Sequence, residues 1–157
     1  VPSAIPSSTP SSIICSIPSS TPSSEVLKKV GNSINGEASN DHSGRSVSLS
    51  SDGHIVAIGA PYNDGNGTSS VGHVRVYEYD SITTSWSQIG DDLDGEAPHD
   101  DSGFSVSLSS DGHIVAIGAP VIGHVRIYEY DSNTTSWSQL GDYLTIELNG
   151  EPLYNYF

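Results

Sequence analysis

The loop that follows the first Gly-Ala-Pro triplet carries side-chain oxygens that could bind a hard cation. It reads Asn63-Asp64-Gly65-Asn66-Gly67-Thr68, and alternating oxygen side chains and glycines can wrap calcium. The loop offers one carboxylate and no glutamate, and a second copy of the same sequence unit lacks it. Asn63, Asp64 and Asn66 are therefore candidate metal ligands, with an ordinary turn-rich loop as the favoured interpretation.

A second group of polar side chains lies in the acidic run that begins at Asp91. Carboxylates in pairs can act as the acid and base of a glycosidase, and a histidine such as His99 can bind a metal. The matching stretch earlier in the chain, residues 32–35, carries amides in place of carboxylates. That exchange favours turn-forming residues over catalytic ones. The competing hydrolase interpretation would use the carboxylates of Asp91, Asp92, Asp100 and Asp101.

The histidines and tryptophans recur in register within the chain. The matching pairs are His54 with His113, His73 with His124, and Trp86 with Trp137. A side chain repeated in every unit usually serves the unit rather than one unique site. We therefore expect structural roles for these residues, and we predict that the chain is not an enzyme and needs no cofactor.

Two Asn-x-Thr sequons fall in expected loops, at Asn66 and Asn133. Such sequons accept N-linked glycans in secreted proteins. They predict a glycoprotein that lies outside the cell or at the cell surface.

The charge of the chain narrows the choice of partners. Its 157 residues include 19 acidic and 5 basic side chains, which give a formal net charge of −14. Such a chain repels nucleic acid and anionic membrane surfaces. No stretch reaches the ~20 apolar residues of a membrane-spanning helix, so we expect no transmembrane segment. The single cysteine, Cys15, excludes a disulfide within the chain and could be a free thiol or pair with another chain.

Residues 1–24 differ in composition from the rest of the chain. Ser, Thr and Pro dominate this segment, and the octet at residues 5–12 recurs unchanged at residues 17–24. It has too few apolar side chains to offset the entropy lost on ordering. We expect a disordered tail, either a plain linker or a glycosylated stalk.

From residue 25 onward the chain repeats itself. Residues 43–61 match residues 102–120 at every position but one, where Arg45 stands against Phe104. Residues 72–91 then match residues 123–142, so the second unit has lost most of one surface loop. The expected divisions are a remnant of a preceding unit at 25–42, repeat 1 at 43–101, repeat 2 at 102–148 and the start of a truncated third repeat at 149–157.

Each repeat predicts four antiparallel strands and no helix, which places the chain in the all-β class. The expected strands are residues 45–49, 54–59, 73–80 and 84–89, then 104–108, 113–118, 124–131 and 135–140. The pair Asp52-Gly53 predicts a two-residue type I′ hairpin turn, with positive φ at both positions. The unbroken apolar run from Ile55 to Ile58 predicts a central strand that is buried on both faces.

This pattern resembles the FG-GAP repeat, the blade motif of integrin α-subunit propellers. The residues that carry the resemblance are Ser43-Gly44 with Val47 and Leu49, then the run from Val56 to Pro61, and their counterparts in repeat 2. The resemblance implies two tandem four-stranded propeller-type blades plus partial flanking strands. It is closest to the divergent repeats found in predicted surface and secreted proteins of microalgae and bacteria.

Two departures from the family limit what the resemblance implies. Family blades that bind calcium carry an Asp-x-Asp-x-Asp-Gly loop where this chain has Ser50-Ser51-Asp52-Gly53. A single carboxylate cannot supply the roughly six to eight oxygens that calcium takes, so we do not expect calcium there. A family propeller closes into a ring of seven blades, which two repeats cannot form.

The expected function is a non-enzymatic extracellular module for binding or adhesion. Its partner would be a protein, a glycan or neighbouring blades. The alternatives are a fragment of a propeller-type hydrolase and a purely structural surface-repeat protein. Two repeats leave their outer faces uncovered, and repeat units generally need about three neighbours to bury a continuous core. We therefore also expect self-assembly, with the isolated chain only marginally stable as a monomer.

Overall fold

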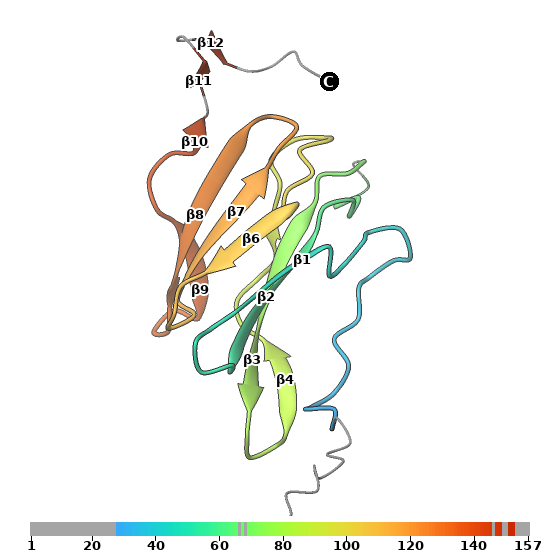
Figure 1. Ribbon diagram of the computed structural model, residues 1–157, viewed down its shortest axis with the longest axis vertical. Helices are drawn as coiled ribbons and strands as arrows, with labels where there is room; N and C mark the ends of the chain where they lie inside the picture. The colour runs from blue at the N-terminus through green and yellow to red at the C-terminus, as the bar shows by residue number, and fades with distance from the viewer. Residues whose placement is uncertain (1–27, 66, 68, 146, 149–150, 153–157) are drawn as a thin grey trace, which may run out of the picture.

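The computed structural model describes residues 28–65, 67, 69–145, 147–148 and 151–152 (Figure 1). Every regular element among these residues is a β-strand, which confirms the all-β class. None of them forms a helix that is long and apolar enough to cross a membrane. The predicted tail at residues 1–24, with Cys15, lies outside the described residues.

The first repeat forms one antiparallel sheet, which we call sheet 1. Its strands are β1 (Ser46–Leu49), β2 (Ile55–Ala60), β3 (His73–Asp80), β4 (Ser85–Gln88) and β5 (Leu93–Asp94). The strand order is β1-β2-β3-β4, and β4 and β5 both pair with β3, at its two ends. The four predicted strands are confirmed, and β5 adds a fifth piece where the acidic run predicts only a turn.

The second repeat forms an equivalent sheet, called sheet 2. Its strands are β6 (Ser105–Leu108), β7 (Ile114–Ala119), β8 (His124–Asp131), β9 (Ser136–Gln139) and β10 (Leu144–Thr145). β11 (Glu147–Leu148) and β12 (Glu151–Pro152) pair only with each other. Two tandem antiparallel sheets of the same topology confirm the predicted blade arrangement.

The turn between β1 and β2 differs from the predicted type I′ hairpin. Gly53 has a φ of 76°, but Asp52 does not have positive φ. The backbone N–H of Gly53 donates to the carbonyl of Ser50, which closes a four-residue turn that ends at the glycine. The Asp52 carboxylate accepts hydrogen bonds from Ser50 Oγ and from the N–H of His54, and this capping favours the longer turn.

Strand register assigns the apolar side chains to two faces of each sheet, because residues paired across neighbouring strands share a face. We call face A the one that carries Val47, Leu49, Val56 and Ile58 in sheet 1 and Val106, Leu108, Val115 and Ile117 in sheet 2. We call face B the one that carries Ile55, Ala57, Val74 and Val76 in sheet 1 and Ile114, Ala116, Val125 and Ile127 in sheet 2.

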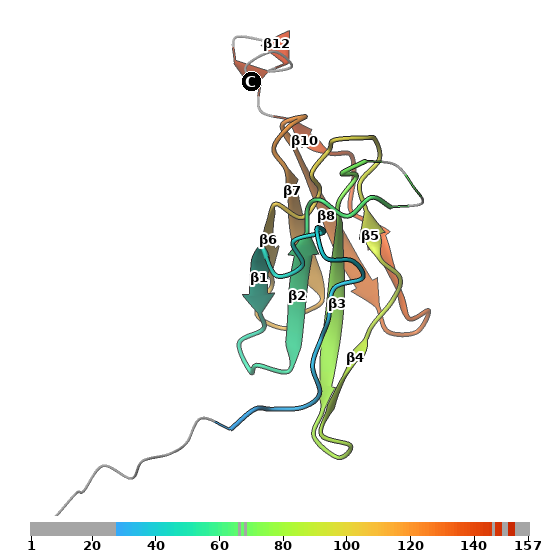
Figure 2. The same ribbon diagram turned by 90° about the vertical axis from the view of Figure 1, so that its right-hand side faces the viewer.

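The two sheets stack with face B of sheet 1 against face A of sheet 2 (Figure 2). The core between them contains Ile55, Ala57, Val74, Val76 and Leu93 from sheet 1 and Val115 and Ile117 from sheet 2. Trp137 packs against this core and donates its indole N–H to the carbonyl of Ile89 at 2.9 Å. Trp137 therefore packs between the two repeats, in the structural role that was predicted.

The prediction that the central apolar strand is buried on both faces is wrong. β2 does lie inside sheet 1, but Val56 and Ile58 are only half-buried. In sheet 2 the unburied face is the opposite one, and Ile114 is 38% exposed. The physical reason is that two sheets share a single interface, so each central strand has one face that no other sheet covers.

Serine side chains join the edge strands β1 and β6 where the two sheets meet. The bonds run from Ser46 Oγ to the carbonyl of Gly103 (2.7 Å), from the N–H of Leu108 to Ser48 Oγ (2.9 Å), and from the N–H and Oγ of Ser51 to the carbonyl of Ser110 (2.9 Å each). We call this line of contacts the seam. It holds the sheets in a fixed register.

We expect Gly59→Ala to lower the free energy of unfolding by about 2 kcal/mol. A Cβ at this position would collide with the carbonyl oxygen of Gly103 across the seam, and backbone cannot move aside without opening the interface. Gly118→Ala is the matched control, since its Cβ would meet only the hydroxyl of Ser105, which can rotate away. Urea denaturation measures both variants, and equal losses would argue against the close approach.

Candidate functional site

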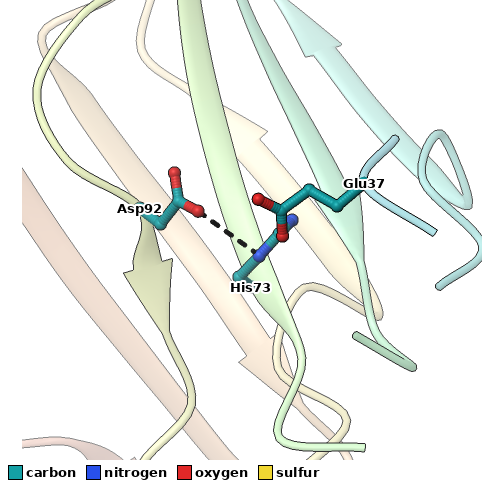
Figure 3. Close-up of side chains that lie close together, drawn as sticks. All are labelled: Glu37, His73 and Asp92. Atoms are coloured by element: carbon teal, nitrogen blue, oxygen red, sulfur yellow. Dashed lines mark ion pairs between the residues drawn. The ribbon is translucent and has the colours of Figure 1, made fainter. Parts of the chain in front are cut away.

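Three separate parts of the chain meet around the guanidinium of Arg75. β3 supplies His73 and Arg75. The segment before β1 supplies Glu37 and the bend before β5 supplies Asp92, and Figure 3 shows these two side chains beside His73. Arg75 Nε donates to Asp92 Oδ1 at 2.9 Å and Nη2 donates to Asp92 Oδ2 at 2.8 Å. Arg75 also forms an ion pair with Glu37. We call these four side chains the Arg75 cluster.

His73 is buried and Arg75 is largely covered, whereas Asp92 is partly exposed and Glu37 is exposed. Hydrogen bonding to Asp92 raises the pKa of Arg75 above its ordinary value. Burial alone would raise the pKa of Asp92, but hydrogen bonds from Arg75 and Gln88 outweigh it and hold that pKa below its ordinary value. Burial, followed by the charge of Arg75, lowers the pKa of His73. At neutral pH the cluster therefore contains a neutral imidazole beside a charged arginine–carboxylate pair.

Three members of the cluster could offer ligand atoms to a metal ion. The donor atoms of Glu37, His73 and Asp92 lie within 4.8 Å of one another, and His73 Nδ1 is 3.6 Å from Asp92 Oδ2 (Figure 3). The guanidinium of Arg75 already pairs with both carboxylates, so a metal ion would have to displace it. In this arrangement the arginine takes the place of a cation and ties the N-terminal segment to β3 and to the bend before β5.

Repeat 2 holds only part of this arrangement. A glutamate and an arginine recur there as Glu96 and Arg126, 3.5 Å apart. The place of the aspartate is taken by Tyr143, whose ring stacks on His124 with centroids 4.0 Å apart. A tyrosine cannot accept two parallel hydrogen bonds from a guanidinium as a carboxylate does. Among the described residues, the complete cluster therefore belongs to repeat 1.

The metal candidates Asn63 and Asp64 stabilise the loop between β2 and β3. Asn63 is buried and its side-chain oxygen accepts from the N–H of Gly65 at 2.8 Å. Asp64 Oδ1 accepts from the N–H of Ser70 at 3.0 Å. Asn66, the third candidate ligand and a predicted glycan acceptor, lies outside the described residues. One oxygen of each placed candidate is therefore engaged by the backbone of the loop itself.

Asn63 also joins this loop to the N-terminal segment and the Arg75 cluster. Its side-chain nitrogen donates to Glu37 Oε2 at 3.0 Å and to Asp41 Oδ2 at 2.9 Å. Glu37 therefore contacts Arg75 with one oxygen and Asn63 with the other. The structure brings a predicted candidate, Asn63, next to a cluster that the sequence did not predict.

The four carboxylates of the hydrolase interpretation have different surroundings. Asp92 is clamped by Arg75, and Asp91 is exposed. Asp100 is fully buried, and its Oδ2 accepts from two successive backbone N–H groups, those of residues 96 and 97. Burial raises the pKa of Asp101. Asp92 and Asp100 are therefore held by structural hydrogen bonds rather than free for acid–base chemistry.

The sequence analysis did not predict the Arg75 cluster, although three of its four residues recur along the chain. Three of its members recur in repeat 2 in register, namely Glu37 as Glu96, His73 as His124, and Arg75 as Arg126. The fourth member does not recur, and its distance from the others along the chain hides it. Only the pairing of β5 with β3 brings this aspartate to the arginine.

We expect the free energy of unfolding to fall as the pH drops from about 7 to about 5, in part because of His73. The folded-state pKa of His73 lies below the unfolded value of 6.5, so the unfolded chain takes up the proton first. This stabilising contribution is complete above pH ~6.5 and is lost as the pH falls toward the folded-state pKa. His73→Gln should flatten the pH dependence in urea melts, whereas His113→Gln, at an exposed position, should retain it. An unchanged slope in His73→Gln would refute this assignment.

A comparison with protein families finds a match in the first repeat and in the segment just before it. Residues 35–77 match the FG-GAP repeat. The matched FG-GAP segment runs from before β1 into β3, so it includes Glu37, His73 and Arg75. The predicted resemblance to FG-GAP repeat proteins is thereby confirmed. No curated protein matches the chain.

Solved structures that are similar to the chain include two bacterial proteins. A Bacteroides fragilis protein assigned as a 6-phosphogluconolactonase shares 14% sequence identity at a TM-score of 0.45, over 64% of this chain and 25% of that one. The periplasmic gluconolactonase of Pseudomonas aeruginosa shares 20% identity at a TM-score of 0.41, over 59% of this chain and 25% of that one. The chain therefore spans a quarter of the length of each.

The prediction that this chain is not an enzyme is contradicted by these two structures, because both proteins are named as lactonases. At these identities the likeness concerns the fold alone, and no substrate or catalytic residue is carried over from either protein. The FG-GAP match and the two stacked sheets describe a propeller fragment.

Proposed function

We propose that the chain is an extracellular binding module of FG-GAP-type propeller blades, and that its partner is a protein or glycan that meets the loop between β2 and β3. The observation that carries this proposal is the number of hydrogen bonds that anchor the loop. Repeat 2 lacks the loop and keeps the same sheet, so the fold of a repeat does not require it. Asn63 is buried beneath the loop, and Asp64 and Ser69 are exposed on it. The described residues of this loop, 62–65, 67 and 69–72, present a surface whose conformation is set before binding, which lowers the entropy cost of association.

The anchoring involves the connection between the two repeats as well. The backbone N–H groups of His99, Asp101 and Ser102 donate to the carbonyls of Ser69, Ser70 and Val71 at 3.0, 3.2 and 3.1 Å. Gly72 forms an isolated parallel β-bridge with Ser102. The loop and the connection therefore form one continuous surface, and its exposed carboxylates, such as Asp64 and Glu96, favour a basic partner.

Deletion of residues 62–69 tests the proposal, because it gives repeat 1 the loop length of repeat 2. The wild-type chain, labelled and applied to an array of glycans and extracellular-matrix proteins, is expected to bind at least one of them. The deletion variant should lose that binding about tenfold or more while its circular dichroism spectrum stays β-rich. Asp64→Asn, which keeps an oxygen for the N–H of Ser70, should weaken binding less and reduce its dependence on salt. Equal binding by wild type and deletion variant, or no binding by wild type, would reject the proposal.

If the chain is extracellular, as we propose, Asn133 should carry an N-linked glycan. This residue is exposed in the turn between β8 and β9, and it begins the sequon Asn133-Thr134-Thr135. When the chain is secreted from eukaryotic cells, we expect an N-linked glycan there. The glycan should be removable by peptide:N-glycosidase and reduced in Asn133→Gln, with any remainder at Asn66. A secreted chain without glycan would count against this assignment.

A further inference from the structure

The chain exposes one apolar face at each end of its stack of sheets. At one end lies face A of sheet 1, where Val47 is 63% exposed and Leu49 is 57% exposed. At the other end lies face B of sheet 2, where Ile114 is 38% exposed and Leu144 is 58% exposed. Apolar surface of this kind at the ends of a stack marks an interaction site rather than a solvated boundary.

Each open face has a buried counterpart of almost the same sequence inside the chain. The apolar residues of face A are Val, Leu, Val and Ile in both sheets, and face A of sheet 2 is covered. The apolar residues of face B differ at one position, Val76 against Ile127, and face B of sheet 1 is covered. The two open faces are therefore complementary to each other in the way that the two buried faces are.

We propose that face A of sheet 1 binds face B of sheet 2 of a second copy of this chain, so that copies associate head to tail. The interface would repeat the contact that sheet 1 makes with β6 and β7 inside the chain. A second copy already carries a surface that fits each open face, because the two repeats have nearly the same sequence. A partner of unrelated sequence would fit these faces only by chance. Because the two surfaces differ, the contact is heterologous, and it builds a ring if the rotation closes or a filament if it does not.

The seam supports the same pairing. Two serines of β1 are half-buried because they bond to the backbone of repeat 2, and their counterparts Ser105 and Ser107 are exposed. In a head-to-tail pair, Ser105 Oγ would donate to the carbonyl of Gly44 of the next copy. Ser107 Oγ would accept from the N–H of Leu49 of that copy. The open ends therefore carry polar groups for the seam as well as apolar surface for the core.

The N-terminal segment limits the contact to part of face A. Trp86 donates its indole N–H to the carbonyl of Val30 at 3.2 Å, and its backbone N–H donates to Asn32 Oδ1 at 2.6 Å. This segment thus covers β4 as the residues around Ile89 cover β9 within the chain. The second copy would cover β1, which carries Val47 and Leu49, and β2, which carries Val56 and Ile58.

Charge gives the association a recognisable salt dependence. Each copy carries a formal net charge of −14, so two copies repel each other at low ionic strength. Added salt screens this repulsion and leaves apolar contacts intact. The association should therefore strengthen with salt, which is the opposite of what an interface built on ion pairs would do.

Sedimentation velocity with paired variants tests the proposal on the full chain, with reductant present to keep Cys15 from forming disulfides. The wild type should associate as its concentration rises to about 100 µM, and more strongly in about 0.5 M salt. Leu49→Asp blocks face A of sheet 1, and Ile114→Asp blocks face B of sheet 2, so each variant alone should be monomeric. An equimolar mixture of the two should form a dimer, because each retains the face that the other lacks.

Ile82→Asp is the matched control, since Ile82 is 92% exposed on the turn between β3 and β4 and lies on neither face. It should associate like the wild type. Circular dichroism confirms that each variant is folded, and Val47→Asp with Ile127→Asp form a second pair if either of the first fails. A wild type that stays monomeric throughout would overturn the proposal. So would an Ile114→Asp variant that still associates like the wild type, since that result would indicate pairing of face A with itself.

Discussion

Ile117→Ala is expected to lower the free energy of unfolding by about 3 kcal/mol, and Ile58→Ala by about 1 kcal/mol. The two isoleucines occupy the same position in the two repeats and have the same neighbours in sequence. Ile117 is 1% exposed in the core between the sheets, whereas Ile58 lies half-buried on the open face of sheet 1. Removing Ile117 leaves a cavity, and removing Ile58 mainly exposes surface that is already in contact with water.

Urea denaturation in dilute solution measures this difference, because association of copies at high concentration would cover Ile58. Val115→Ala against Val56→Ala is an independent pair of the same design, with the buried member again in sheet 2. If the sheet 1 variant of either pair lost as much stability as its partner, the assignment of the buried faces would be wrong.

Arg75→Met is expected to lower the free energy of unfolding by about 3 kcal/mol. Methionine approximates the volume of arginine but carries no charge. The substitution therefore leaves Glu37 and Asp92 facing each other without a cation between them. Arg126→Met is the matched control in repeat 2, where the arginine contacts an exposed glutamate and a serine hydroxyl. We expect that variant to cost about 1 kcal/mol or less, because no pair of carboxylates is left behind.

A second substitution separates the charge effect from packing. Adding Asp92→Asn to Arg75→Met removes the repulsion between the unpaired carboxylates and should recover part of the lost stability. A double variant that is as unstable as the sum of both single variants would show that Arg75 acts through packing alone. Thermal melts at pH 7 measure all three variants.

Much of the fold could be predicted because each repeat carries strong local signals. Alternating apolar residues around Val47 and the run from Ile55 predict strands, and the glycines and prolines between them predict turns. The detail of the first hairpin was wrong, since the hydrogen bonds that Asp52 accepts favour a longer turn over the type I′ geometry. β5 was missed because the short acidic stretch around Leu93 has no strand signal of its own.

The candidate site was less predictable than the fold. Asn63 and Asp64 were predicted as candidate metal ligands from their residue types. The structure shows that both accept hydrogen bonds from the backbone of their own loop. The Arg75 cluster draws on segments more than fifty residues apart, so no local pattern contains it. Its aspartate belongs to a bend whose position depends on the pairing of β5 with β3.

The sequence by itself determined the repeat and the four main strands of each unit, because these depend on the pattern of near neighbours along the chain. It could not determine which face of each sheet is buried, because the two repeats carry the same apolar residues on both faces. Only the stacking of the sheets decides that Ile117 is buried while Ile58 is not. Identical sequences acquire different surroundings because a stack of two has one interface and two ends, and burial is a property of position in the stack.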